Sequence, residues 1–528
     1  MRFPVFSLLF VLLCCGCSVS HRRVNWCAPS VESALASVGD ASQTLIDALL
    51  SARRLEQADE PACVEAYFHV ATETLPNSPI HKVAVAKLVE TAGRFGRIDM
   101  EVGIHLASGR AASVLRFQTN GFEWSNDEFR EFIPVGKYCA EGLACHNATD
   151  GPGTAFVVLG EDRRSKPLLL ECEPFAATAM LIQTEGSYEL HWYAPKVAAQ
   201  QGLAYDRTAP IAFGMIGTEK VALEDYRFPS EPSAGPTLFM GQPYQRGKTP
   251  VIFVHGLASD ASTWAGTINE LRQCEDLNDR FQFWFFEYPS GLSVLGNAAA
   301  LRQQIKCLIH RIDPKGTDPA LQRMIIVGHS AGGLIAKAQC CASGNRLWDA
   351  AFKQSLADLK LAPEVESDLK RDFYFEPSSR IDQVIYIATP HRGSVISYHL
   401  PARLATHLVQ TPQLIRSEHR DLLRNNPHSV RWQLRHRMPT CVDLLKPNSQ
   451  ILQALDACPI AGNVRVDSII GFGHSHHPWQ DSDGVVAVSS ATDKRSTTET
   501  FINAKHTKIK SDPATINQLI RLLSERCP

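Results

Sequence analysis

The sequence predicts an α/β fold with a mainly parallel sheet for residues 241–528, preceded by an N-terminal α+β region. In this C-terminal half, short and continuously apolar runs alternate with segments of helical periodicity. Strands that are apolar at every position are typical of parallel sheets, because helices cover both faces of such a sheet. We expect strands at residues 251–254, 282–287, 324–327, 384–388, 468–470 and 500–503.

Helices are expected between these strands. Leu301, Ile305 and Leu308 recur at helical spacing and form one apolar face. Further helical segments are expected at residues 332–341 and 514–523. Strands that alternate with helices in this way build a sheet with helices on both sides.

The N-terminal half has a different pattern. Residues 18–100 are expected to be helical, since Leu45 and Leu49 lie on one helical face. Residues 101–240 are expected to be β-rich and to end in a linker. Within them, residues 185–186 separate two runs of strand character, which predicts a hairpin.

The boundary between the two halves is expected near residue 240. Residues 229–250 contain five prolines and three glycines. Such a density of residues that interrupt helices and strands marks a linker or an extended entry strand.

The overall composition excludes several classes of protein. Lys plus Arg number 53 and Asp plus Glu number 55, which gives a net charge of −2. That balance argues against a dedicated nucleic-acid-binding protein, which normally carries a strongly basic surface. No run of 18 or more apolar residues exists, so no spanning helix is predicted.

Fifteen cysteines among 528 residues are too few for a disulfide scaffold. Two pairs are close enough in sequence to form disulfides in an oxidising compartment, namely Cys139 with Cys145 and Cys441 with Cys458. Residues 340–341, a cysteine pair in a predicted helix, are interpreted as core packing.

Residues 1–17 are interpreted as an export signal. A basic start precedes an apolar run at residues 5–13, and Gly16 then precedes Cys17. This resembles a bacterial lipoprotein signal, in which a small residue precedes the cysteine that is lipidated. The resemblance implies a lipid anchor on Cys17 and a location in the bacterial cell envelope, with plain secretion or an uncleaved segment as alternatives.

The strongest single motif is Gly328-His329-Ser330-Ala331-Gly332, which follows a predicted strand and opens a predicted helix. In this G-x-S-x-G context the serine lies on a tight strand-to-helix turn, and the flanking glycines let the backbones pass. The positive N-terminal end of the helix favours a developing oxyanion. Ser330 is therefore the predicted nucleophile.

These features resemble the α/β-hydrolase superfamily, and most closely its lipase and GPI-inositol-deacylase-like serine esterases. The resemblance covers residues 249–528 and does not extend to the N-terminal half. It implies an α/β-hydrolase fold. A helical cap is expected at about residues 394–462, because this crossover is long and its pattern is helical. The resemblance also implies a Ser-Asp-His catalytic triad that acts on ester bonds without a metal or organic cofactor.

His255-Gly256-Leu257 ends the first strand of this domain. In the family that it resembles, this position contributes a backbone N–H to the oxyanion hole. The resemblance therefore assigns the N–H groups of Leu257 and Ala331 to that role. His255 as the base is disfavoured, because this fold orders its triad Ser, acid, His along the chain; a structural hydrogen bond is the other interpretation.

The acid is expected at Asp483. The segment Ser482-Asp483-Gly484-Val485-Val486 resembles the acid loop of the same esterases. An aspartate there would orient the imidazole and stabilise its charged form. The alternatives are Asp481, Asp382 and a purely structural role of the Asp-Gly pair in a turn.

The base is expected at His506, which follows the last predicted strand and precedes the final helix, where the family carries its histidine. His474, His476 and His477 compete for the role. Together with Asp481 these three could instead ligate a metal. Their spacing matches no standard zinc pattern, so a loop that lines the site or faces solvent is the favoured interpretation.

Two further segments resemble parts of these lipases or differ from the rest of the chain. Residues 389–394 resemble a loop with a structural or pocket-lining role, so His391 is not expected to be catalytic. Residues 394–440 hold seven Arg, no Lys and two acidic residues. This charge pattern fits a solvated helical face, or a cationic surface for anionic lipid headgroups or an acidic substrate.

The sequence thus predicts a serine esterase or lipase that acts through an acyl-enzyme on an ester substrate, lipid esters included. An acyltransferase with the same triad is one alternative, and a non-catalytic envelope binding protein is another. Neither a nucleic acid nor a cofactor is expected to take part.

Overall fold

The computed structural model describes most of the chain as two compact units. Among the described residues, the N-terminal unit holds residues up to 215 together with 240–245, and the C-terminal unit holds 235–239 and everything from 246 onward. The described residues are 24–37, 42–108, 111–124, 128–140, 142–143, 146–160, 174–215, 235–257, 259–394, 413–431, 435, 440–475 and 481–526.

The N-terminal unit begins with a short strand at residues 24–27, where the sequence analysis expected helix, and the predicted helices follow. The helix that begins at Pro79 is capped by its local sequence: Ser78 accepts a hydrogen bond from the amide of His81, and Pro79 occupies the first helical position. The helices are α2 (Val31–Ala36), α3 (Gln43–Gln57), α4 (Cys63–Thr72) and α5 (Pro79–Arg94).

A seven-stranded sheet follows in the order β2-β3-β4-β10-β9-β8-β5. The predicted hairpin is confirmed, since β9 and β10 pair antiparallel across residues 185–186, with Gly186 at φ 84°. β10 also pairs parallel with β4, which the sequence pattern did not predict. The strands are β2 (Ile98–Asp99), β3 (Gly103–Ser108), β4 (Ala111–Asn120), β5 (Glu131–Pro134), β8 (Thr154–Leu159), β9 (Phe175–Thr184) and β10 (Ser187–Tyr193).

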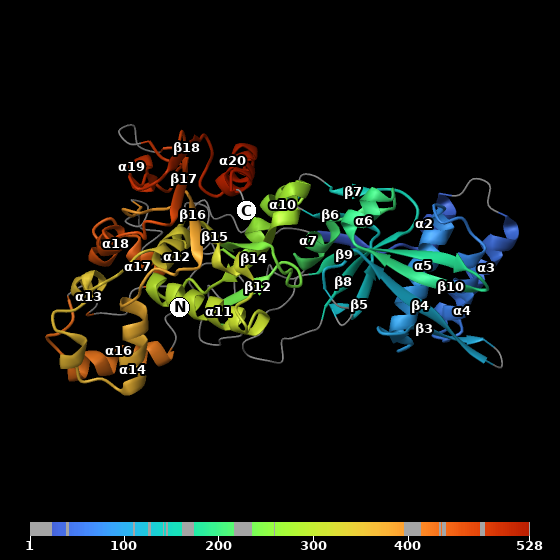
Figure 1. Cartoon of the computed structure of the whole chain (residues 1–528), viewed down its shortest axis with the longest axis horizontal. Coiled ribbons are helices and arrows are strands. Elements are labelled where there is room, and N and C mark those ends of the chain that lie inside the picture. The colour runs from blue at the N-terminus through green and yellow to red at the C-terminus, as the bar shows by residue number, and fades with distance from the viewer. Residues whose placement is uncertain are drawn as a thin grey trace, which may run out of the picture. The chain divides into compact units, whose positions relative to one another are not determined.

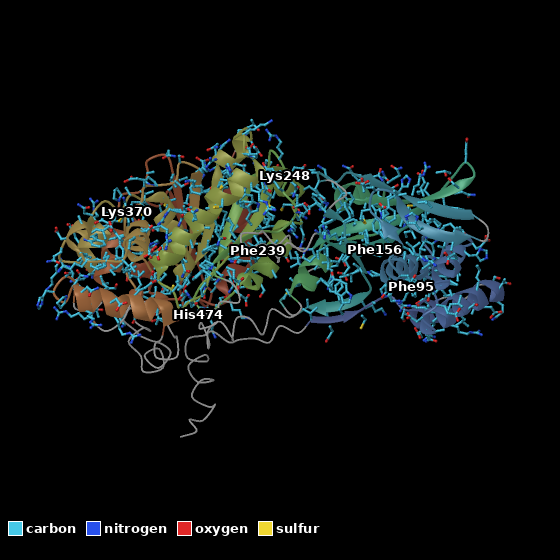
Figure 2. All side chains as sticks on the ribbon, turned by 90° about the horizontal axis from the view of Figure 1, so that it is seen from below. Phe95, Phe156, Phe239, Lys248, Lys370 and His474 are labelled. Atoms are coloured by element: carbon cyan, nitrogen blue, oxygen red, sulfur yellow. The ribbon has the colours of Figure 1, made fainter. Side chains whose placement is uncertain are left out.

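The helices and the sheet of this unit share one hydrophobic core. Trp192 stacks on Phe132 with ring centroids 4.4 Å apart and meets Phe156 edge-on at 5.2 Å. Phe156 is labelled in Figure 2 among the side chains of this unit. Smaller elements complete it: β1 (Val24–Cys27) with β6 (Lys137–Ala140), β7 (Ala148–Thr149) with β11 (Tyr205–Asp206), α6 (Pro195–Gln200) and α7 (Ala209–Gly214).

The C-terminal unit is built on a second seven-stranded sheet, in the order β12-β14-β13-β15-β16-β17-β18. From β14 to β18 every neighbouring pair is parallel, so the predicted α/β class is confirmed. The strands are β12 (Thr237–Met240), β13 (Thr249–Val254), β14 (Phe281–Glu287), β15 (Met324–His329), β16 (Ile381–Ile387), β17 (Arg465–Gly471) and β18 (Thr498–Ile502).

Helices pack on this sheet in two groups (Figure 1). α11 and α12 contact each other, and α12 lies against β15 and β16, whereas α20 contacts α9 and α10. The helices are α9 (Ala265–Leu271), α10 (Glu275–Arg280), α11 (Val294–Ile312), α12 (Ala331–Cys340), α13 (Arg346–Ala351), α14 (Pro363–Phe373), α16 (Gln413–Asn425), α17 (Cys441–Leu444), α18 (Gln450–Asp456), α19 (Val488–Ala491) and α20 (Pro513–Ser524).

The strand order determines where a site can form. β13 lies between β14 and β15, so the connections from β13 and β14 leave in opposite directions along the sheet. In open α/β sheets a crevice forms at the carboxyl ends of the strands where the order reverses. The carboxyl ends of β13 and β15 carry residues 255–257 and Ser330.

Several predictions fall partly or wholly outside the described residues. The export signal and Cys17 lie outside them, as do parts of the expected cap. The described parts of the cap contain α16, α17 and α18. Across the part of the chain that the structure describes, no helix combines the length and apolar character needed to span a bilayer.

Candidate active site

Ser330 lies in a strained turn between β15 and α12. Its backbone has φ 53° and ψ −125°, and residues other than glycine rarely adopt a positive φ. The amide of Ser330 donates a 2.9 Å hydrogen bond to the carbonyl of Ile387, which ties the turn to the end of β16. Strain of this kind persists only where the surroundings enforce it, and it concentrates at functional sites.

Glycines around this turn allow three backbones to pass within contact distance. A Cβ on Gly328 would lie 2.6 Å from the Cα of Gly333, and a Cβ on Gly332 would lie 2.5 Å from the carbonyl oxygen of Val254. A Cβ on Gly333 would meet Cγ2 of Thr389 at 2.7 Å. The predicted role of the flanking glycines is therefore confirmed, and Gly333 adds a third close approach.

The structure brings Ser330, His506 and Asp483 together. The Nε2 atom of His506 lies 2.9 Å from Oγ of Ser330, and its Nδ1 atom lies 2.7 Å from Oδ2 of Asp483. All three residues are buried, with exposed fractions of 6% or less. Among the described residues, His506 is the histidine whose ring hydrogen-bonds to Ser330.

Backbone amides hold the carboxylate of Asp483 in place. Its Oδ1 atom accepts hydrogen bonds from the amides of Val485 at 2.9 Å and Val486 at 2.7 Å. This arrangement leaves Oδ2 for the imidazole of His506, whose own amide donates to the carbonyl of Asp483 at 3.0 Å. Gly484, at φ 93°, provides the turn, so the Asp-Gly pair also has the structural role that the sequence suggested.

His329 contacts the backbone of His506, and the sequence analysis did not predict this contact. Its Nε2–H donates a 3.0 Å hydrogen bond to the carbonyl of His506. Burial, followed by the positive charge of Lys510, lowers the pKa of His329 well below its ordinary value. The sequence feature that could have pointed to His329 is a polar residue at the end of an otherwise apolar strand.

The loop that follows β13 lies directly against this turn. A Cβ on Gly256 would lie 3.2 Å from the Cβ of Ser330 and 2.9 Å from Nδ1 of His329. Ala331 is the first residue of α12, where backbone amides have no partner inside the helix. Within the described residues, the amides of Leu257 and Ala331 both lack a hydrogen-bond acceptor.

His255 has a structural role and does not reach Ser330. Its Nδ1–H donates to the carbonyl of Gly256 at 2.8 Å, and its Nε2 accepts the amide of Tyr288 at 3.2 Å. The phenol of Tyr288 donates in turn to the carbonyl of His255 at 2.9 Å. Both ring nitrogens are occupied, which excludes His255 as the base and confirms the structural interpretation.

The alternative acids lie elsewhere. Asp481 is exposed, and its Oδ1 accepts the amide of Gly473 at 2.8 Å. Asp382 lies near the amino end of β16, away from the carboxyl end that carries Ser330, and pairs with Arg526 at 2.7 Å. Neither carboxylate hydrogen-bonds to His506 in the described part of the chain.

The histidine-rich loop is only partly described. His474, labelled in Figure 2, is tied to the acid loop by its amide, which donates to the carbonyl of Ser482 at 2.9 Å. His476 and His477 lie outside the described residues. A metal site in this loop therefore stays untested.

A second cluster lies behind the nucleophile helix. His391, Asp456 and Asp493 place possible ligand atoms within 4.8 Å of one another. The ammonium of Lys337 already lies among them, 2.6 Å from Asp456 Oδ1, 3.3 Å from His391 Nδ1 and 3.5 Å from Asp493 Oδ2. Arg495 adds a second cation, 2.7 Å from Asp493.

The charges of this cluster are balanced internally. Burial opposes ionisation of Asp493, but Arg495 and Lys337 hold the pKa of its carboxyl below its usual range. Burial, followed by the charge of Lys337, lowers the pKa of His391 well below its ordinary value. His391 thus has a structural environment, in line with the sequence expectation. Lys337, fully buried in a mainly apolar helix, is the residue that sequence reasoning missed.

Comparison with known proteins supports the fold of this unit. Residues 245–351 match the model of a family described as "PGAP1-like alpha/beta domain", which confirms the resemblance over that segment. Comparison of the chain with curated proteins finds no match.

Solved structures with similar folds include three bacterial hydrolases. Lipase BlEst2 from Bacillus licheniformis in mature form is 17% identical, with 54% of this chain and 97% of that chain covered and a TM-score of 0.35. Phospholipase PlaB from Legionella pneumophila is 16% identical, with 52% and 60% covered and a TM-score of 0.32. A thermophilic esterase from Thermogutta terrifontis is 13% identical, with 56% and 90% covered and a TM-score of 0.30. These likenesses are too distant to assign an activity.

Burial of His255 predicts a pH-dependent stability. Burial lowers its pKa to about 4, so the folded state binds a proton less readily than the unfolded state. The neutral, buried imidazole of His255 therefore contributes to stability fully above about pH 6.5. This contribution is lost as the pH falls toward about 4, which lowers the free energy of unfolding by about 3 kcal/mol. Urea unfolding at about pH 7 and about pH 4.5 measures it.

His255→Gln should reduce the loss of stability between the two pH values, whereas His310→Gln, a change at an exposed histidine, should leave it unchanged. An equal loss in the wild type and in His255→Gln would contradict the assignment.

Proposed function

We propose that this protein is a serine carboxylic-ester hydrolase of esterase or lipase type. The observation that carries the proposal is the hydrogen-bonded chain from Ser330 Oγ through His506 to Asp483, with distances of 2.9 and 2.7 Å. A buried serine, a histidine and a carboxylate in this geometry match the arrangement that activates a hydroxyl for attack on a carbonyl.

In the first step, Ser330 Oγ attacks the ester carbonyl while His506 Nε2 takes its proton. Asp483 remains ionised and stabilises the imidazolium through its 2.7 Å contact with Nδ1. The negative oxygen that develops on the substrate is bound by the N–H groups of Leu257 and Ala331. Each donor of this kind contributes a factor on the order of 10² to 10³ in rate.

In the remaining steps, His506 returns the proton to the leaving alcohol, and the acyl group stays on Ser330. Water then attacks the acyl-enzyme, with His506 again accepting a proton and passing it to Ser330. Side chains, backbone amides and water carry each of these steps. An alcohol or amine in place of water would make the same site an acyltransferase, and product analysis with an added acceptor distinguishes the two outcomes.

Removal of the nucleophile tests the proposal. Ser330→Ala should lower turnover of p-nitrophenyl esters of graded chain length by at least about a thousandfold, because the acyl-enzyme cannot form. It should also abolish labelling by a fluorophosphonate probe, while Ser524→Ala, at an exposed serine of α20, changes neither. Unchanged turnover and labelling in Ser330→Ala would favour a non-catalytic binding protein.

The acid is tested by comparing two neighbouring aspartates. Asp483→Asn should reduce kcat on the order of 10⁴-fold, because an amide cannot hold His506 in the required tautomer. Asp481→Asn should leave kcat nearly unchanged, since its carboxylate bonds to Gly473. The opposite ranking would transfer the role to Asp481.

We also propose that the protein is exported and anchored to the bacterial envelope by lipid on Cys17. The sequence at residues 14–17 supports this proposal. Labelling of the full-length protein with a radioactive fatty acid should be seen in the wild type and lost in Cys17→Ser. Equal labelling of both proteins, or labelling of neither, would reject the lipid anchor.

A further inference from the structure

Two cysteines that are far apart in sequence meet behind the nucleophile helix. Cys341 follows the last residue of α12, and Cys458 lies just after α18. The chain segments that carry them are joined by an antiparallel bridge between Cys341 and Ile460. The amide of Ala342 donates to the carbonyl of Pro459 at 3.0 Å, and the amide of Ala461 donates to the carbonyl of Cys340 at 2.9 Å.

The bridge brings the two side chains near each other. Cys458 lies two residues before Ile460, the bridge partner of Cys341, so the two cysteines are diagonal neighbours, and both are fully buried. The Sγ of Cys458 donates a hydrogen bond to the carbonyl of Ala454 at 3.2 Å. The interaction between the two thiols lowers the pKa of Cys458 and raises the pKa of Cys341, so Cys458 is the thiol better suited to attack.

The neighbouring cysteines are placed differently. The Sγ of Cys441 lies 3.6 Å from the side-chain amide of Asn297, and the Sγ of Cys340 lies 3.9 Å from the hydroxyl of Tyr386. The structure therefore sets Cys458 against Cys341, whereas its spacing in the sequence suggested Cys441. Cys145, the other expected partner, lies outside the described residues.

We propose that Cys341 and Cys458 form a disulfide in the mature protein. The oxidant is a disulfide of the compartment, either a small molecule such as oxidised glutathione or a disulfide-bonded oxidoreductase. The thiolate of Cys458 attacks one sulfur of this oxidant, forms a mixed disulfide and releases the first thiol. Cys341 then displaces the second thiol, so that two protein thiols lose two protons and two electrons and the oxidant is reduced to two thiols.

This bond would fix the helix that carries the nucleophile. α12 begins next to Ser330 and ends just before Cys341, while Cys458 precedes β17, whose carboxyl end leads to Asp483. Lys337 on α12 already pairs with Asp456 at 2.6 Å, two residues before Cys458. The ion pair already holds the end of α12 next to the end of α18. The disulfide would add a covalent bond between the same two parts of the chain, and it would close the loop of residues 341–458.

The test uses the full-length protein in a Cys340→Ala, Cys441→Ala background. This background is needed because trypsin does not separate Cys340 from Cys341, nor Cys441 from Cys458, since Lys446 precedes a proline. The protein is equilibrated with oxidised glutathione, alkylated with iodoacetamide in denaturant and digested. Mass spectrometry should find the two tryptic peptides joined, and the joined peptide should disappear with dithiothreitol.

The two cysteine variants provide the controls. Cys341→Ser and Cys458→Ser, each in the same background, should lose the joined peptide. The oxidised background protein should melt on the order of 10 °C above its reduced form, because the closed loop is long, and neither variant should show this difference. Alkylation of both cysteines after oxidation, or glutathione retained on either one, would overturn the proposal. A joined peptide without any rise in melting temperature would overturn the stabilising role.

Discussion

The close passage of backbones around Ser330 is the constraint on which the rest of the site depends. α12 can begin where it does only because Gly328, Gly332 and Gly333 carry no side chains. A Cβ on Gly328 would strike the start of α12, and Cβ atoms on Gly332 and Gly333 would strike the end of β13 and the segment after β16. The hydrogen bond from Ser330 to Ile387 then fixes the positive φ of the turn. Ala388, the next residue, also has a positive φ of 50°. Two strained residues thus directly follow the ends of adjacent strands, and one backbone hydrogen bond joins these ends.

Three buried histidines of this unit are kept uncharged by their surroundings. His255, His329 and His391 all have lowered pKa values because they are buried. Each hydrogen-bonds to a backbone carbonyl or to Lys337, so each has a structural role. Of the three, His329 bonds to the backbone of His506 and helps to position the residue between a hydroxyl and a carboxylate.

Charge is concentrated near the C-terminal end of the nucleophile helix. Lys337, in the last turn of α12, is balanced by Asp456 and Asp493. A buried ammonium is costly unless it is paired, so this cluster joins α12 to α18 and to the segment after α19. α12 is therefore held at its start by the turn and near its end by ion pairs.

The sequence predicted the parts of this structure that depend on local pattern. The parallel strands were predictable because each is continuously apolar, and Ser330 because its motif follows a strand and opens a helix. Asp483 and His506 could be named because their segments resemble those of a known family. The contacts of Lys337, of His329 with His506 and of Cys341 with Cys458 were not predictable, since each joins residues distant in sequence.

The N-terminal unit shows the same limit at the level of topology. Its hairpin at Gly186 was predictable from turn chemistry, whereas the parallel pairing of β4 with β10 depends on a contact between strands about 70 residues apart. Hydrophobic pattern identifies strands but leaves the order of strands in a sheet undetermined.

A crystal structure of the protein after reaction with a fluorophosphonate tests the central claim most directly. The account predicts phosphorus bonded to Ser330 Oγ and the phosphonyl oxygen within hydrogen-bond distance of the amides of Leu257 and Ala331. The imidazole of His506 should remain in contact with Asp483. Phosphorus on another residue, or a phosphonyl oxygen turned away from both amides, would contradict the account.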